Sequence, residues 1–434
     1  MTKSEFRMRR KEFMRRMGKG NIALIASAPA CQRNNDIHYP YRPDSDFYYL
    51  TGFEEPEALA VFVPGRRPAE YILFCREYDP VKALWTGHHA GIEGAKLVYG
   101  ADDAFPIDDV DEIVPGLMEN KNRVYYPLGR YSELDQQVID WVRQLRERVR
   151  SGITAPMEFI ALESLLHEMR LIKSPTELKI MRSAANVSAK AHMRAMRTAR
   201  AGLYEHQIEA ELLHEFMRNG MRSTAYPSIV AGGTNACVLH YTQNRDKLQD
   251  GDLLLIDAGA ESRNYASDIS RTFPVSGRFS EVQRLLYQLV LDAQLAAIAK
   301  VKPGNHWNDP HDSAVKVLTR GLVDLGLLQG RVSELIKNDD YKKFYMHRTG
   351  HWLGMDVHDV GSYKVDDEWR LLEPGMVLTV EPGLYVSADC ADVDKKWLGI
   401  GIRIEDDVVV TDDGCEVLSA KVPKTIEEIE ALMA

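Results

Sequence analysis

Acidic residues follow apolar runs at several points in the C-terminal part of this chain, where buried strands would be expected to continue. The run LLLI is followed by Asp257, and Asp268 comes eleven positions later in a second strand-like run. In MVLTVEPGLYV, Glu381 follows an apolar strand, and in GIGIRIEDDVVVT a period of two places Glu405 on the same face as Arg403. Buried carboxylates repel one another unless protons or cations neutralise them. The pattern therefore predicts a fold that gathers strand ends around cations.

The segment ESRN between the first two acids predicts the turn of a β-hairpin. A pairing centred between Ser262 and Arg263 sets Asp257 directly opposite Asp268. Like charges that face each other across a strand pair destabilise the pair, so a cation or a proton is expected between them. In the alternative interpretation, Asp257 caps a turn before Gly259 and Asp268 is exposed.

Histidines add a second kind of candidate ligand. His347, His351 and His358 fall in the glycine-broken stretch YMHRTGHWLGMDVHDVG, and His240 lies in CVLHYTQN. A single such histidine is often a hydrogen-bonded core residue, but three so close together indicate imidazoles that line a cleft. Four carboxylates and one neutral imidazole carry a charge of about −4, which two divalent cations balance, and oxygen-rich ligation favours Mn²⁺, or Co²⁺, Fe²⁺ or Zn²⁺. The residues therefore predict a two-metal hydrolase.

The composition is that of a globular chain, with 434 residues, 45% of them hydrophobic, and a formal net charge of −10. A general nucleic-acid binder needs a positive face to neutralise phosphates, so we expect no nucleic-acid partner. No apolar run approaches the ~20 residues that span a bilayer, and the basic start lacks the apolar stretch of a secretory signal. That start is interpreted as a helix packed on the N-terminal domain, with a mitochondrial presequence as the alternative.

Cysteine usage favours a reducing compartment, and hence a cytoplasmic protein, over a disulfide framework. The cysteines are odd in number, widely scattered and without a CxxC pair. They are Cys31, Cys75, Cys237, Cys390 and Cys415.

The chain divides into two expected domains. Apolar strand-like runs alternate with helical stretches from residue 20 to about 150, as in an α/β domain. Near residue 170, Ser174, Pro175 and Glu177 provide an N-cap, a first-turn proline and a capping box for a long amphipathic helix. Further helices are expected at 204–219, 280–300, 311–326 and 424–433. The similar segments GDLLLIDAG and GMVLTVEPG hint that the second domain has two related halves.

The motifs LLLIDAGA, SDISRTF, GHWLGMDVHD, VEPGLY and GIRIEDD resemble, in order, the metal-binding stations of the pita-bread metallopeptidases, the superfamily of creatinase, methionine aminopeptidase and prolidase. The segment RNNDIHYPYRPDSDFYYLTGFEEPEA resembles the N-terminal domain of the aminopeptidase P family. The resemblance implies an α/β N-terminal domain at residues 1–168, followed by an α+β pita-bread (creatinase-like) catalytic domain at 169–434. It implies as metal ligands Asp257, Asp268, His351, Glu381 and Glu405.

The same resemblance implies a mechanism and a substrate class. A hydroxide that bridges two divalent ions, Mn²⁺ being favoured, would attack the first peptide bond of peptides with proline in second position. Glu381 would accept the proton of the attacking water. His240 and His358 would bind substrate or steady the oxyanion, and His347 would line the same pocket. Further residues are expected to bind substrate or to hold the ligands: Arg403, Tyr363, Asp36 and Trp85.

Some questions stay open at the level of sequence. The segment KVDDEWRLLEPG departs from the family pattern, so whether Arg370 contacts substrate is undecided. A prolidase, which cleaves only Xaa-Pro dipeptides, is the main alternative, and a non-catalytic pita-bread binding module is a further one. The resemblance also implies a homodimer or homotetramer.

Overall fold

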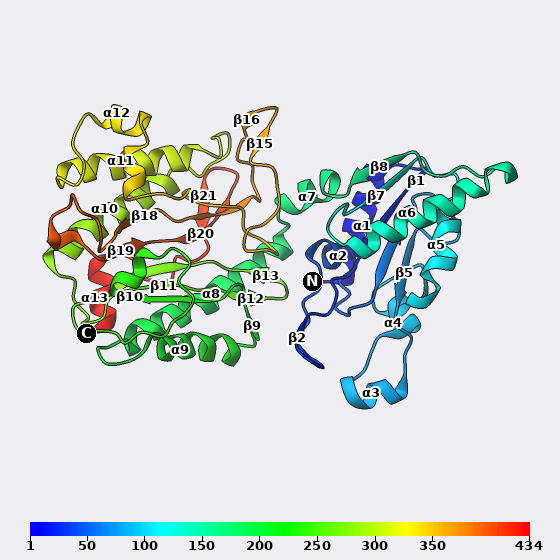
Figure 1. Ribbon diagram of the computed structural model, residues 1–434, viewed down its shortest axis with the longest axis horizontal. Helices are drawn as coiled ribbons and strands as arrows, with labels where there is room; N and C mark the ends of the chain where they lie inside the picture. The colour runs from blue at the N-terminus through cyan, green and yellow to red at the C-terminus, as the bar shows by residue number, and fades with distance from the viewer. The chain divides into compact units, whose positions relative to one another are not determined.

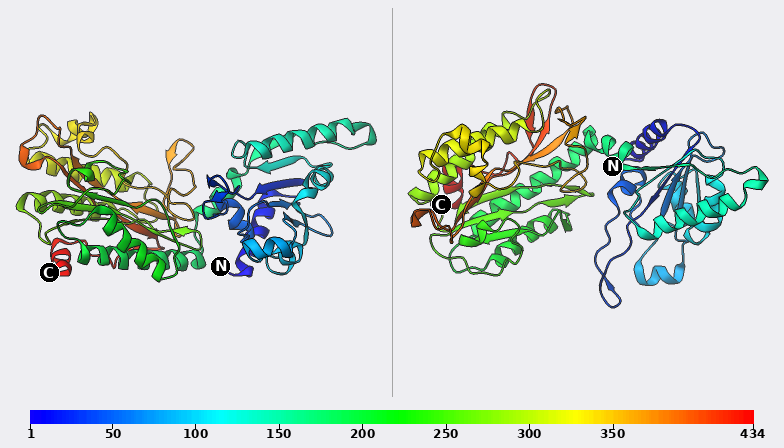
Figure 2. Two further views of the ribbon diagram at one scale, coloured as in Figure 1. Left: turned by 60° about the horizontal axis from the view of Figure 1, so that its bottom comes forward. Right: turned by 45° about the horizontal axis from the view of Figure 1, so that its top comes forward.

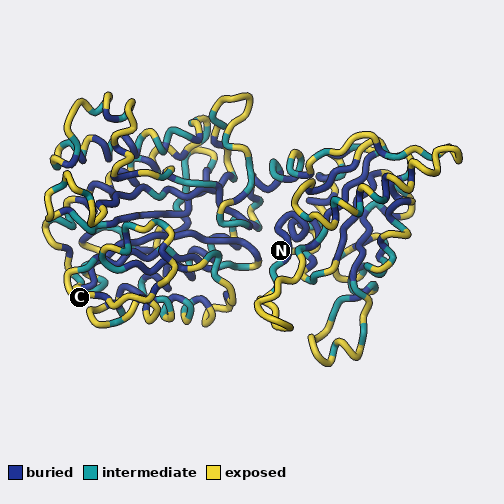
Figure 3. The backbone as a smooth tube through the Cα atoms, in the orientation of Figure 1, coloured by how far each residue is buried: buried dark blue, intermediate teal, exposed yellow.

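The computed structural model describes all 434 residues and contains two compact units, Met1–Arg170 and Leu171–Ala434. Each unit has a buried core of its own, which Figure 3 shows as dark strands and helices beneath exposed loops. No helix combines the length and the apolar character that crossing a bilayer requires.

The N-terminal unit is built on a six-stranded mixed sheet with the order β6-β5-β4-β1-β7-β8 (Figure 1). Central strand β1 is antiparallel to β4 and parallel to β7. Four strands occupy the predicted apolar runs. Strands β6 and β8 are short and largely unburied, so their sequences show no apolar pattern from which a strand could be predicted. The strands are β1 (Asn21–Ala26), β4 (Leu59–Phe62), β5 (Tyr71–Cys75), β6 (Asp103–Pro106), β7 (Arg123–Tyr126) and β8 (Glu158–Ala161).

Helices cover this sheet, and two segments project from it. Val114, Val138 and Trp141 pack with the sheet residues in one core. The hairpin of β2 (Gln32–Asn34) and β3 (Ile37–His38) is exposed, and so is α3. The helices are α1 (Lys3–Met17), α2 (Ser45–Thr51), α3 (Pro80–Thr86), α4 (Gly91–Leu97), α5 (Val110–Met118), α6 (Ser132–Glu147) and α7 (Glu163–Leu171).

The C-terminal unit opens with α8 (Pro175–Thr198), which begins where the sequence predicts. The Ser174 hydroxyl accepts a hydrogen bond from the Glu177 N–H at 3.3 Å, and a Glu177 carboxylate oxygen accepts one from the Ser174 N–H at 2.8 Å. Figures 1 and 2 show α8 running along the strands of this unit. The other helices are α9 (Glu205–Arg218), α10 (Glu281–Ile298), α11 (Asp309–Asp324), α12 (Val332–Lys337) and α13 (Ile426–Met433).

Small antiparallel sheets form the middle of the C-terminal unit, between the α8–α9 pair and the α10–α11 pair (Figure 1). The two similar segments become β11 and β17, so each contributes a strand that leads into a candidate acid. The sheets are β10-β11-β14 (Ile229–Gly232, Leu253–Asp257, Ser270–Pro274), β13-β12-β9 (Tyr265–Ala266, Ala260–Ser262, Ser223–Thr224), β17-β20-β21 (Val377–Val380, Asp406–Val410, Cys415–Val417), β18-β19 (Gly383–Val386, Ile400–Arg403) and β15-β16 (Lys364–Val365, Glu368–Trp369).

The predicted register of the 253–274 hairpin is wrong by one residue at the turn. The turn residues are Arg263 and Asn264, both with positive φ (49° and 63°), as a tight hairpin turn requires. Asp257 therefore pairs with Ser270 and not with Asp268. Asp268 is two residues before Ser270, so the two acids lie diagonally on one face of the hairpin. The hydroxyl of Tyr226 contacts both of them, which agrees with this placement.

Candidate metal centre

One cavity of about 890 Å³ in the C-terminal unit collects all five residues expected as metal ligands. Strand ends deliver the acids, and the loop before the β15–β16 hairpin delivers the histidine. The lining also includes four other predicted residues with imidazole or phenol groups, together with the predicted arginine. These are His240, His347, His358, Tyr363 and Arg403.

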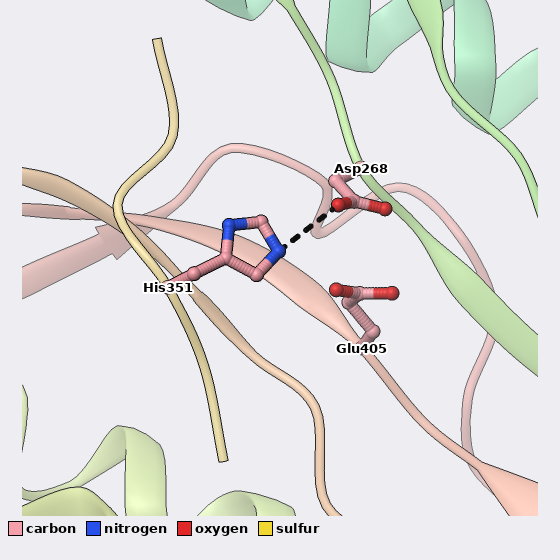
Figure 4. Close-up of side chains that lie close together, drawn as sticks. All are labelled: Asp268, His351 and Glu405. Carbon is pink, nitrogen blue, oxygen red and sulfur yellow. Dashed lines mark ion pairs between the residues drawn. The ribbon is translucent and has the colours of Figure 1, made fainter. Parts of the chain in front are cut away.

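Asp268, His351 and Glu405 form the tightest cluster (Figure 4). One ligand atom from each lies within 4.8 Å of the others, which is close enough for a shared metal ion. His351 Nε2 lies 3.3 Å from Asp268 Oδ2 and 3.7 Å from Glu381 Oε1. Carboxylate and imidazole groups at these separations match the ligands of divalent first-row metals.

His351 is oriented by its own backbone neighbourhood. Its Nδ1 lies 2.9 Å from the carbonyl oxygen of Trp352, so this nitrogen donates a proton and Nε2 faces the acids. Burial would lower the pKa of His351, but the hydrogen bond to Asp268 and the charge of Glu381 raise it to about 9. The same bond holds the pKa of Asp268 below its usual range, against the opposite effect of burial. A proton here takes the place that a cation would fill.

Asp257 is held at the cavity by Arg403 and Tyr226. Arg403 Nη2 donates to Asp257 Oδ2 at 2.7 Å. The Tyr226 oxygen lies 2.6 Å from Asp257 and 2.5 Å from Asp268. A hydroxyl has a single proton to donate, so the second contact needs a proton from a carboxyl group. Burial raises the pKa of Asp257, which agrees with such a proton.

Glu405 is tied to Arg403 through a residue that the sequence analysis did not single out. The Ser270 hydroxyl donates to Glu405 at 2.7 Å and accepts from Arg403 Nε at 2.9 Å. The neighbouring Arg271, fully buried, donates to the Glu405 carbonyl at 2.6 Å and to Asp406 at 2.8 Å. Both residues lie in the SDISRTF motif. Polar residues inside a strand were the sequence signal that could have identified them as part of the site.

Excess negative charge dominates the electrostatics of this cavity. Burial raises the pKa of Glu381 to about 7 and raises that of Glu405 well above its usual range. Burial also lowers the pKa of His347 to about 3, with Arg403 adding to the effect, so this imidazole is neutral. Its Nε2 lies 2.9 Å from the Tyr385 hydroxyl. Glu381 and Glu405 thus favour protons that a divalent cation would displace, and the donor set fits such ions.

The remaining predicted residues differ in placement. The Tyr363 ring lies parallel to that of Trp352 at 5.7 Å, on the cavity wall. Asp36 and Trp85 belong to the exposed β2–β3 hairpin and α3 of the N-terminal unit. The backbone of Arg370 pairs with that of Tyr363.

Tyr226 and Arg348 are further cavity residues that sequence reasoning missed. Tyr226 lies in the segment AYPSIV, and Arg348 stands directly after His347. Neither position carries a recognisable pattern of its own, so only the folded chain identifies them.

Comparison with known proteins agrees with this geometry. Residues 179–412 match metallopeptidase family M24, and residues 6–125 match the aminopeptidase P N-terminal domain. The Xaa-Pro aminopeptidase of Escherichia coli K12 is 44% identical over 434 residues, covering 100% of this chain and 98% of that protein. The human Xaa-Pro aminopeptidase 3 is 34% identical and covers 97% of this chain and 82% of its own length.

Solved structures show the same relationship. An aminopeptidase of Pseudomonas aeruginosa superposes with a TM-score of 0.99 at 57% identity, over 100% of this chain and 98% of that one. Zinc-substituted E. coli aminopeptidase P in complex with product gives a TM-score of 0.97 at 44% identity, with coverage of 100% and 98%. These likenesses confirm the predicted fold class, with its N-terminal domain and pita-bread catalytic domain. The chain therefore belongs to metallopeptidase family M24, among the aminopeptidase P proteins.

Proposed function

We propose that this chain is a dinuclear-metal aminopeptidase that releases the N-terminal residue from peptides with proline in the second position. The observation that carries the proposal is the convergence of four carboxylates and an imidazole on one cavity, in a chain similar over its full length to Xaa-Pro aminopeptidases. Residues 1–168 would form the N-terminal domain and 169–434 the catalytic domain.

Five side chains would hold the ions, with Mn²⁺ as the favoured metal. When bound, divalent ions make water acidic enough to attack near neutral pH and polarise the substrate carbonyl. The cluster of Asp268, His351 and Glu405 supports one ion. Asp257 and Glu381, which line the same cavity, would complete the second.

The cavity residues would also move a proton, bind the substrate and hold the ligands in place. Glu381 would accept the proton of the attacking water, since it lies at the cavity surface, 3.7 Å from His351. His347 would line the same pocket: its Nδ1 donates to the Arg348 carbonyl, so in this neutral imidazole Nε2 accepts from the Tyr385 hydroxyl. His240 and His358 would bind substrate or steady the oxyanion. Arg403 would fix Asp257 through its 2.7 Å hydrogen bond.

The aromatic wall would receive the proline ring. Trp307, Trp352 and Tyr363 pack together, with Trp307 centred 4.7 Å from Tyr363. A flat apolar wall suits a ring that has no N–H to satisfy. Asp36 and Trp85 would reach the site of a neighbouring subunit in a homodimer or homotetramer. The cytoplasmic location, supported by five free cysteines, and the lack of a nucleic-acid partner stay predictions.

A peptide assay with metal removal tests the proposal. The protein is treated exhaustively with a chelator, dialysed, and supplied with Arg-Pro-Pro, with and without Mn²⁺. We expect no hydrolysis without metal and release of free arginine after Mn²⁺ is restored. Ala-substituted Arg-Ala-Pro serves as the control for proline specificity and should be cleaved poorly.

Three outcomes would contradict this function. Hydrolysis that survives complete metal removal would exclude the metal mechanism. Turnover of Arg-Pro with none of Arg-Pro-Pro would identify the prolidase alternative, and metal binding without hydrolysis of either peptide would favour a binding module.

A further inference from the structure

The cavity is lined by three cationic side chains with different surroundings. Arg403 is buried and donates to Asp257. Arg348 and Lys364 are exposed, and no carboxylate of the chain lies within ion-pair distance of either. Two cations without anionic partners at the wall of a substrate cavity are available to an anionic group of a ligand.

A single indole positions both cations. The Arg348 guanidinium lies 5.1 Å from the centre of the Trp369 ring, and the Lys364 ammonium lies 4.9 Å from it. Lys364 and Trp369 are directly paired across the β15–β16 hairpin. Arg348 also donates to the side chain of Asn308. Stacking on the ring face leaves most of the guanidinium and ammonium donors free.

This pair lies on different elements from the acids. The acids come from strand ends of β11, β14, β17 and β19, whereas Lys364 comes from the β15–β16 hairpin and Arg348 from the loop before His351. A cavity with acids on one set of elements and cations on another complements a zwitterion. A peptide whose amine meets the acidic, metal-binding side would present its carboxylate to the cations.

The size of the cavity indicates which peptides could make both contacts. The cavity of about 890 Å³ has room for a short peptide, and an extended tripeptide spans about 10 Å. A longer peptide would carry its carboxylate past the cavity, and a capped peptide would have none.

We propose that Arg348 and Lys364, held on Trp369, form a subsite for the C-terminal carboxylate of the substrate and give the enzyme a preference for tripeptides with a free carboxyl end. This inference rests on the proposed aminopeptidase function and specifies the substrate of that same cavity.

The test compares Arg-Pro-Pro with its C-terminal amide in the Mn²⁺-loaded enzyme. We expect kcat/KM for the free acid to exceed that for the amide by about 5-fold, since two solvent-exposed ion pairs form only with the acid. The double variant Arg348→Met/Lys364→Met should lose this preference through a higher KM for the acid, with kcat and the amide kinetics little changed. Arg348→Lys should retain part of it.

Two controls keep the outcomes distinct. Lys190→Met removes an exposed cation of α8 outside the cavity and should leave the acid-to-amide ratio unchanged. Raising the salt concentration should raise KM for the acid more than for the amide. Equal kcat/KM for acid and amide in the unmodified enzyme, or a ratio that survives the double substitution, would overturn the subsite and leave the aminopeptidase function standing. Failure to cleave either peptide would instead reject the proposed function.

Discussion

At the scale of single residues, Ser270 and Arg403 position the candidate ligands through hydrogen bonds. Ser270 is fully buried and links Glu405 to Arg403, which in turn holds Asp257. One hydroxyl thus relates acids that lie far apart in the sequence. Groups of this kind set the direction of ligand oxygens, and replacing them typically weakens metal binding 10- to 100-fold, by order of magnitude.

Ser270→Ala should therefore weaken metal binding by about 10-fold or more and destabilise the fold by about 1–3 kcal/mol, because Glu405 and Arg403 each lose a buried partner. The Mn²⁺ concentration for half-maximal activity and the urea midpoint of unfolding measure the two effects. Ser276→Ala, which removes an exposed hydroxyl bonded to the Arg278 carbonyl, is the matched control. Equal behaviour of the two variants would refute the role of Ser270.

At the scale of elements, α8 holds the hairpin that carries Asp257 and Asp268. The Ser188 hydroxyl contacts that of Ser267 at 2.8 Å, and His192 Nε2 lies 3.0 Å from the Ala258 carbonyl. The sequence analysis predicted α8 correctly because Ser174 and its capping box are local signals.

The hairpin register could not be predicted in the same way. Its turn needs positive φ at Arg263, and arginine has no preference for that conformation. The register also depends on a close approach between Gly259 and Ser267 across the hairpin. A side chain at Gly259 would meet the Ser267 carbonyl oxygen at 1.7 Å, so this pairing requires glycine.

His192 gives α8 a measurable dependence on pH. Burial lowers the pKa of His192 to about 4, below the value of about 6.5 in an unfolded chain. The unfolded chain thus binds more protons between these pH values. The contribution of His192 to the free energy of unfolding is therefore fully present above pH 6.5 and is lost as the pH falls towards 4, by up to ~3 kcal/mol. His192→Gln should flatten this dependence. Urea unfolding at pH 5 and pH 7, in chelator to exclude metal effects, measures it, and parallel pH curves for both proteins would contradict the assignment.

At the scale of the whole molecule, local sequence patterns carry more information about the fold than about contacts between distant segments. The fold class, and the five residues that meet at one cavity, could be predicted from motifs, because strand-borne acids and ordered spacing survive as local patterns. The contacts of Tyr226 and Arg348 could not, since they depend on the meeting of distant segments. In the N-terminal unit, the short helix α3 leaves Leu84 and Trp85 each 86% exposed. Adjacent large apolar side chains that are both exposed are typical of interaction surfaces.

We expect the protein to sediment as a homodimer or homotetramer, with a mass above the 49.2 kDa of one chain. Leu84→Gln/Trp85→Gln should shift the equilibrium towards monomer and lower activity if neighbouring subunits complete the site. Sedimentation velocity over a range of concentrations measures this, with the exposed Met157→Gln as control. A monomeric unmodified protein at micromolar concentration would contradict the expectation.

The span from Asp257 to Glu405 has a consequence for the life of the chain in the cell. The candidate centre can assemble only after translation has passed residue 405, so a chain that stops earlier lacks one of its carboxylates.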